Sequence, residues 1–173
     1  RDWLKVELAR SKARWKIICN GMPLGITARG KGKPIDNAAN GAGPALGREL
    51  EIAHILQYMR DSKVQNVVWL TADLHYATAT HYSPDRGRFK EFDPFWEFMA
   101  GPLNAGTGKL HKLDPTFGAR TEWASIDKST RYHASPNEGA QFYGMVEISS
   151  SSGNLTVSFH DQDQRELHRQ TLA

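Results

Sequence analysis

The chain has 173 residues, of which 39% are hydrophobic, and a formal net charge of +3. This composition fits one folded domain spanning residues 1–173 and excludes the low hydrophobicity typical of disordered proteins. Cys19 is the only cysteine, which excludes an internal disulfide and a thiolate zinc cluster, and no apolar run reaches the roughly 18 residues of a membrane span.

A buried strand is predicted over residues 15–19, where an apolar and partly β-branched run ends at the Gly- and Pro-containing stretch of residues 21–25. The polar residues before this strand lack the apolar core of a signal peptide and show no obvious initiating segment. We therefore expect the chain to be a portion of a longer protein. Alternating basic residues also lie here, and they are typical of the solvated edge of a strand or helix: Arg10, Lys12, Arg14 and Lys16.

The next segments predict a loop, a helix and a strand. Residues 30–47 are rich in Gly, Asn, Ala, Lys and Pro, which predicts a long exposed loop. Residues 47–61 have helical periodicity, with Leu50, Ala53 and Leu56 on one face and Ile52, Ile55 and Met59 alongside. Residues 66–71 form a continuous β-branched and aromatic run, the pattern of a strand covered on both faces. A helix followed by a buried strand predicts layered α/β packing.

The rest of the chain is predicted to be rich in loops and to end in strands. Between residues 77 and 141, short aromatic stretches alternate with Pro, Asp and Gly, so we expect little regular structure there beyond a strand near residues 97–100. Apolar residues alternate with polar ones from Val146 onward, with turns at residues 149–154 and 161–164. This pattern predicts a three-stranded antiparallel meander with one face buried. The acidic turn at 161–164 lacks the Gly and the later Glu of a calcium loop.

The strongest chemical signal follows the strand predicted at residues 66–71, where the chain runs into Asp73 and His75. Ligands are often placed at the carboxyl end of a central strand, because the packed sheet fixes the backbone there. A carboxylate oxygen and an imidazole nitrogen suit Fe, Mn or Zn, and the carboxylate alone suits Ca. The alternative is a helix cap or a hydrogen-bonded loop pair in which His75 is merely packed.

Asn104 is a further candidate, for substrate binding, because the small residues of the 101–106 loop let its amide and backbone approach an anion. A tight structural turn is the alternative for this loop. Three other histidines are scattered and are expected to be surface or satisfied core residues: His81, His133 and His160.

Four blocks occur in an order that resembles the C-terminal half of the alkaline phosphatase D (PhoD-like) metallophosphoesterases. They are Gly47-Arg48-Glu49-Leu50-Glu51-Ile52, residues 66–76, residues 95–106 and Leu113-Asp114-Pro115-Thr116-Phe117-Gly118. The similarity extends from about Trp15 to the end of the chain. It implies an α/β fold, part of a calcineurin-like metallophosphoesterase fold with two sheets flanked by helices, ending in an antiparallel β-meander.

The same resemblance implies the function. It points to hydrolysis of phosphate mono- and diesters with calcium and iron, at a periplasmic or secreted location. By position, Asp73 and His75 match the family's late metal-site motif, and Asn20 is the candidate metal ligand in the loop after Ile18. Relatives often have an acidic residue where this chain has Gly21. Whether His75 ligates a metal or contacts the leaving oxygen as the catalytic group stays open.

The family's earlier metal motifs are absent from this sequence, so the resemblance implies that the chain supplies only part of an active site. Its expected partners are a phosphate-ester substrate and the missing N-terminal half of the same protein, with no specific nucleic acid. We therefore predict that this chain alone binds metal weakly and turns over little substrate. The alternative is a non-catalytic β-rich module that binds a partner or polyanion through the basic N-terminal strand, in which Arg14 and Lys16 would matter.

Overall fold

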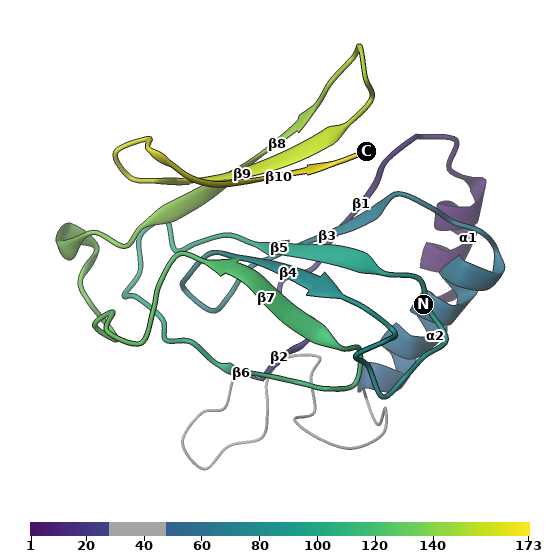
Figure 1. Cartoon of the computed structure of the whole chain (residues 1–173), viewed down its shortest axis with the longest axis horizontal. Helices are drawn as coiled ribbons and strands as arrows, with labels where there is room; N and C mark the ends of the chain where they lie inside the picture. Colours follow the sequence, from purple (N-terminus) through teal and green to yellow (C-terminus); the bar gives the residue numbers. More distant parts are fainter. Residues whose placement is uncertain (28–47) are drawn as a thin grey trace.

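The computed structural model describes residues 1–27 and 48–173 (Figure 1). The helices are α1 (Asp2–Arg10), α2 (Arg48–Asp61) and the short 3₁₀ helix η1 (Pro136–Glu138). The strands are β1 (Lys16–Cys19), β2 (Ile26–Thr27), β3 (Val67–Thr71), β4 (Thr78–Tyr82), β5 (Phe95–Met99), β6 (Lys112–Leu113), β7 (Ala119–Ala124), β8 (Phe142–Ile148), β9 (Leu155–Asp161) and β10 (Glu166–Leu172). In the described ranges, no helix has both the length and the apolar character needed to cross a membrane.

A five-stranded sheet with the order β1-β3-β5-β4-β7 forms the centre of the molecule. Strands β1, β3 and β5 are parallel, while β4 is antiparallel to both β5 and β7. The three parallel strands therefore end at the same edge of the sheet. This edge lies away from the two long helices, at the end of the molecule where the loops before β6 and around η1 gather (Figure 1).

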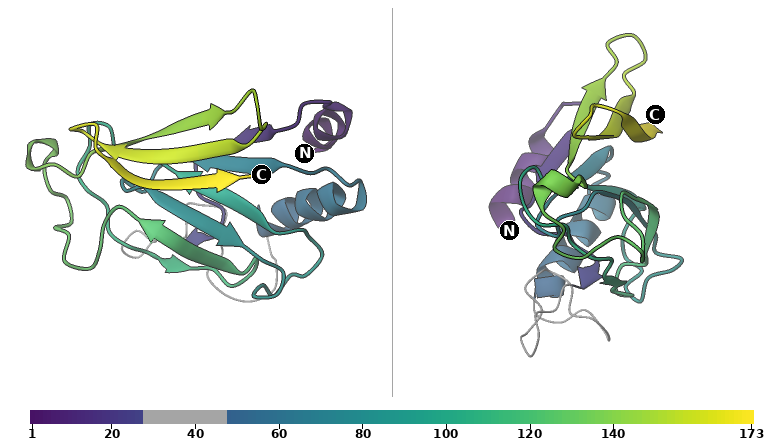
Figure 2. Two further views of the ribbon diagram at one scale, coloured as in Figure 1. Left: turned by 45° about the horizontal axis from the view of Figure 1, so that its top comes forward. Right: turned by 90° about the vertical axis from the view of Figure 1, so that its left-hand side faces the viewer.

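The two helices pack on one face of this sheet. Ala53, Leu56 and Met59 of α2 belong to a buried cluster that also contains Trp69 of β3 and Phe95 of β5. Burial of these side chains stabilises the layer by roughly 1.5–3 kcal/mol for each large aliphatic or aromatic group. Figure 2 shows both helices at the same end of the sheet.

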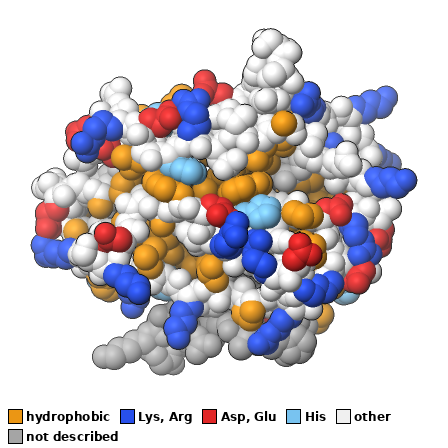
Figure 3. Space-filling model, in the orientation of Figure 1, with side chains coloured by type: hydrophobic (Ala, Val, Ile, Leu, Met, Phe, Trp, Pro, Cys, Tyr) orange, Lys and Arg blue, Asp and Glu red, His pale blue; other side chains and the backbone are white. Residues whose placement is uncertain are grey.

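The antiparallel sheet β10-β9-β8 covers the other face. Leu155, Val157 and Phe159 of β9 are buried against a cluster that includes Val68 of β3 and Phe98 of β5. Because β9 is the middle strand, its apolar face supplies the contact between the two sheets. Figure 3 shows further apolar side chains between the three-stranded sheet and β7, surrounded by charged groups.

Most of the elements expected from the sequence are confirmed. The predicted strands at residues 15–19, 66–71 and 97–100 correspond to β1, β3 and β5, and the predicted helix at 47–61 corresponds to α2. The architecture is mixed α/β with a C-terminal three-stranded antiparallel sheet, as expected. The loop predicted at residues 30–47 lies entirely outside the described residues.

Two expectations are wrong, and one helix was not predicted. Residues 77–141 contain β4 and β7 as well as β5. Strand β4 was missed because it is buried on both faces, yet its Thr side chains make the segment polar in sequence. Helix α1 precedes β1, although only Leu8 of this helix is buried, which explains its weak sequence pattern. Leu50 was expected on the core face of α2 and is 43% exposed.

The meander is confirmed as three strands, but only part of it is buried as expected. Val146 and Ile148 of β8 are 37% and 54% exposed, because this strand extends past the five-stranded sheet. The predicted turn at 161–164 is present, since Oδ1 of Asp161 accepts hydrogen bonds from the backbone N–H groups of Asp163 and Arg165 at 2.9 and 3.0 Å.

The basic residues before and within β1 are tied to the rest of the fold. Arg14 donates a hydrogen bond to the carbonyl of Ser152 at 3.1 Å, and the Lys16 ammonium donates to the carbonyl of Gln65 at 3.2 Å. The Trp15 indole N–H donates to the carbonyl of Gly153 at 2.7 Å. The Arg14 and Trp15 contacts join the N-terminal segment to the turn between β8 and β9, and the Lys16 contact joins β1 to the residue pair before β3. Both cations therefore have structural partners.

Candidate active site at the carboxyl edge of the parallel strands

The carboxyl ends of β1, β3 and β5 deliver the candidate residues to one edge of the sheet. The backbone N–H of Asn20 donates to the carbonyl of Leu70 at 2.9 Å, which aligns the end of β1 with that of β3. The N–H of Ala100 donates to the carbonyl of Thr71 at 3.2 Å, which aligns β5 with β3 in the same way. The segments bearing Asn20, Asp73 and Asn104 therefore leave the sheet side by side.

Asp73 and His75 leave β3 through an unusual backbone. Their φ angles are 85° and 59°, in the left-handed region that costs energy for most residues with a side chain. Leu74 between them is buried, while Asp73 and His75 are exposed. The buried Leu74 anchors the turn and leaves the carboxylate and the imidazole on the accessible side. In the described part of the chain the Asp73 carboxylate forms no hydrogen bond or ion pair.

The His75 ring is held by the loop that follows β5. Its Nδ1 lies 2.7 Å from the carbonyl oxygen of Gly106, and the N–H of Gly108 donates to the His75 carbonyl at 2.9 Å. A carbonyl oxygen only accepts hydrogen bonds, so Nδ1 carries the proton. In the neutral ring Nε2 is then free to accept a proton or bind a metal ion.

Gly108 allows this close approach. A Cβ atom at position 108 would lie 2.0 Å from the carbonyl oxygen of Leu74, well inside the contact distance of any real Cβ. Tyr76 packs at the same place, and burial raises the pKa of its hydroxyl to about 12. Tyr76 therefore stays protonated at neutral pH and contributes no negative charge beside His75.

Asn104 is exposed on a loop clamped by a buried side chain. The Gln141 amide oxygen accepts the N–H of Ala105 at 3.3 Å, and its Nε2 donates to the Ala105 carbonyl at 3.0 Å. This pairing holds the backbone next to Asn104 at both of its hydrogen-bonding groups. No sequence pattern indicated this role for Gln141, because its partner Ala105 lies in a different loop.

The Asn20 side chain turns back onto its own loop. Its Nδ2 donates to the carbonyl of Met22 at 2.6 Å. Asn20 also lines a hollow of about 290 Å³ with Glu51 and Ile52 of α2, and neither Asp73 nor His75 lines it. The structure thus joins the His75 segment to the Asn104 loop by hydrogen bonds, while the Asn20 amide is bound to the Met22 carbonyl and joins neither of them.

Asp73 and His75 have the donor types that suit Fe, Mn or Zn, with a hard oxygen and a borderline nitrogen. Across residues 1–27 and 48–173, no three His, Cys, Asp or Glu side chains group closely enough to hold a metal ion. The described residues therefore present a pair of candidate ligands rather than a complete coordination shell.

A buried carboxylate on β5 holds together the segments that lead to the candidate site. Glu97 is fully buried, and its Oε1 accepts hydrogen bonds from the Leu24 N–H at 2.9 Å and the Thr71 hydroxyl at 2.8 Å. The Tyr82 hydroxyl donates to Oε2 and accepts the Gly25 N–H at 2.8 Å. Burial raises the pKa of Glu97, although these hydrogen bonds oppose the rise. This network fixes the loop after β1 to the sheet, and the sequence pattern did not reveal it.

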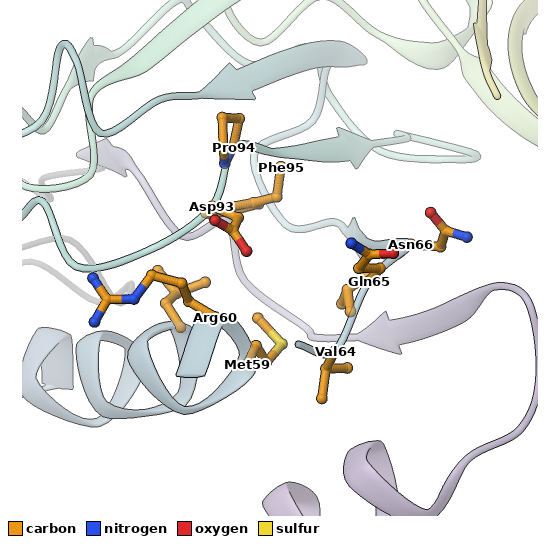
Figure 4. Close-up of a pocket in the computed structure, with 10 residues that line it drawn as sticks. Met59, Arg60, Val64, Gln65, Asn66, Asp93, Pro94 and Phe95 are labelled. Carbon is orange, nitrogen blue, oxygen red and sulfur yellow. The ribbon is translucent and has the colours of Figure 1, made fainter. Parts of the chain in front are cut away.

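Another hollow lies at the opposite edge of the sheet. It has a volume of about 480 Å³ and is lined from the end of α2 and the starts of β3 and β5, including Arg60, Gln65 and Asp93 (Figure 4). Arg60 is already paired with Asp61 and Glu91. This hollow is therefore separate from the edge that carries Asp73 and His75.

Comparison with known proteins identifies a family for this chain. A search of curated proteins gives no match to the chain. The family model described as PhoD-like phosphatase matches residues 1–159, which covers β1, α2, the Asp73–His75 turn and most of β9. The chain therefore belongs to the PhoD-like phosphatase family.

Proposed function

We propose that this chain supplies part of the active site of a metal-dependent hydrolase of phosphate mono- and diesters, with Asp73 and His75 at its centre. Membership of a phosphatase family supports a phosphatase-type hydrolase. The observation that carries the assignment of residues is the hydrogen bond from His75 Nδ1 to the Gly106 carbonyl, which leaves Nε2 free beside Asp73 at the carboxyl edge of the sheet.

Each residue has a defined part in this proposal. Asp73 presents an unpaired carboxylate to a cation, and His75 presents Nε2 either to the same cation or to the leaving oxygen as a general acid. Asn104 presents an amide N–H to a phosphoryl oxygen. A bound cation at such a site polarises the phosphoryl group and lowers the pKa of its water. Calcium and iron remain the proposed metals, and an exported location the proposed compartment, because the resemblance implies both.

The remaining ligands are proposed to come from another segment of the same protein, the expected N-terminal half. In the described part of the chain, β1 forms one edge of the five-stranded sheet, and Ile17 on it is 40% exposed. Edge strands present unpaired backbone groups to which a further strand can be added. This arrangement is consistent with low turnover by residues 1–173 alone.

The test compares phosphate release and metal content in the intact protein and in residues 1–173 alone. Asp73→Asn keeps the side-chain shape and tolerates the positive φ at this position. We expect it to lower kcat by a factor of about 100 or more and to reduce the bound metal. Asp93→Asn, an exposed carboxylate at the opposite edge of the sheet, is the matched control and should leave both unchanged. Equal activity in the two variants would contradict the proposal.

A further inference from the structure

A second loop packs beside the loop that holds His75. The N–H of His133 donates to the carbonyl of Thr107 at 2.8 Å, and the N–H of Thr107 donates to the carbonyl of Ala134 at 3.1 Å. Thr107 lies between Gly106, whose carbonyl binds the His75 ring, and Gly108, whose N–H binds the His75 carbonyl. The loop around residue 133 therefore has a fixed position relative to the candidate catalytic ring.

Three side chains from these two loops contact one another at the surface. The Lys109 ammonium lies 5.1 Å from the centre of the Tyr132 ring, within the range of a cation–π interaction. The His133 ring lies 3.8 Å from the Tyr132 ring, centre to centre. Tyr132 is 51% exposed, and Lys109 and His133 are exposed as well. The tyrosine thus orients a cation and an imidazole without covering them.

His133 also faces the loop that holds His75. A Cβ atom at Gly106 would lie 3.5 Å from His133 Nδ1, so the imidazole borders the residue whose carbonyl binds His75. The φ angle of His133 is 57°, a left-handed conformation that turns the chain at this residue.

The positive charge of Lys109 is not neutralised within the described ranges. Its ammonium forms no ion pair there, and the Glu138 carboxylate on the loop that carries Tyr132 is already bound to Arg131 and to the N–H of Ser135. An oriented, unpaired ammonium next to an imidazole is a recognition element for a phosphate group.

We propose that Lys109 and His133, oriented by Tyr132, form a subsite for a second phosphate group carried by the alcohol portion of the substrate. This inference rests on the proposed function, because it takes the scissile phosphate to lie at Asp73 and His75. The preferred substrates would then be phosphate esters whose leaving alcohol bears another phosphate a few bonds away, rather than esters of neutral alcohols.

The test uses a matched pair of ligands and a matched pair of variants. The ligands are the monophosphate and the bisphosphate of propane-1,3-diol, and their dissociation constants are measured by calorimetry on the metal-supplemented protein. Lys109→Met removes the charge and keeps the length of the side chain. Lys5→Met is the control, because Lys5 lies 5.2 Å from the Tyr58 ring centre, in an equivalent contact between α1 and α2.

We expect the wild-type protein and Lys5→Met to bind the bisphosphate more tightly than the monophosphate. Lys109→Met should bind the bisphosphate about fivefold more weakly and the monophosphate unchanged. Equal affinities in the wild type, a preference that survives in Lys109→Met, or no binding of either ligand would each overturn the subsite. Asp73-dependent phosphate release measured on the same samples tests the proposed function separately, since the subsite can fail while hydrolysis persists.

Discussion

The ring nitrogen Nδ1 of His75 donates a hydrogen bond of 2.7 Å to the carbonyl oxygen of Gly106. The His75 carbonyl in turn accepts the N–H of Gly108 at 2.9 Å, so the turn after β3 and the loop after β5 are joined at two points. This pairing fixes both the tautomer and the direction of the imidazole before any ligand arrives.

Replacing His75 by Asn distinguishes the role of Nδ1 from the role of Nε2. The Asn side-chain N–H can take the place of Nδ1 toward Gly106, and Asn tolerates the φ of 59°. Nothing then replaces Nε2, so we expect kcat for phosphate release to fall by a factor of about 100 to 10,000 with little change in Tm. Metal analysis of the variant distinguishes a ligand, whose loss lowers metal content, from a general acid, whose loss does not. Full activity in this variant would rule out both roles.

Gly108→Ala tests the close approach between the two loops. The added Cβ would lie 2.0 Å from the Leu74 carbonyl oxygen, so the turn carrying Asp73 and His75 must shift. We expect a loss of about 1–3 kcal/mol in the free energy of unfolding, together with reduced activity. Gly21→Ala is the control, because a Cβ there meets no described atom within 4 Å. Urea unfolding and initial rates compare the two, and similar behaviour would argue against this packing constraint.

Gln141→Leu tests the clamp on the Asn104 loop. The variant leaves both backbone groups of Ala105 without their side-chain partner, which should cost about 1–3 kcal/mol of stability. If Asn104 binds the phosphoryl group, the loosened loop should also raise KM more than it lowers kcat. Gln170→Leu is the control, since Gln170 of β10 is only partly buried and its side chain donates to the carbonyl of the next residue, Thr171. An unchanged KM in an active Gln141→Leu enzyme would separate Asn104 from substrate binding.

The sequence predicted the parts of the fold whose burial follows a simple period. Strands β1 and β3 and helix α2 were predictable because continuous apolar runs and helical spacing report burial directly. Strand β4 was not predictable, because the sheet is covered on both faces there and even Thr78 and Thr80 are buried. Its mixture of polar and apolar residues therefore does not report burial. Helix α1 buries a single residue and so leaves almost no pattern.

The candidate site was predictable only where one segment contains it. The strand that runs into Asp73 and His75 is a local signal, and the positions of both residues at the carboxyl edge follow from parallel pairing. Gln141, Lys109 and Glu97 act through contacts with distant segments, so no local pattern could identify them. Their roles depend on which loops the topology brings together.

Glu97 gives a prediction about pH. Burial raises the pKa of its carboxyl above the ordinary value of 4.5, so the native state holds a proton that the unfolded chain releases. Its contribution to the free energy of unfolding is therefore greatest below pH 4.5 and falls as the pH rises through the raised pKa. Glu97→Gln cannot titrate and should lack this dependence. Urea unfolding at pH values from about 4 to 8 measures the free energy of unfolding of the wild type minus that of the variant, and this value should fall as the pH rises. If the wild type instead gained stability relative to the variant as the pH rises, the hydrogen bonds from Tyr82 and Thr71 would stabilise an ionised Glu97 more than burial disfavours it.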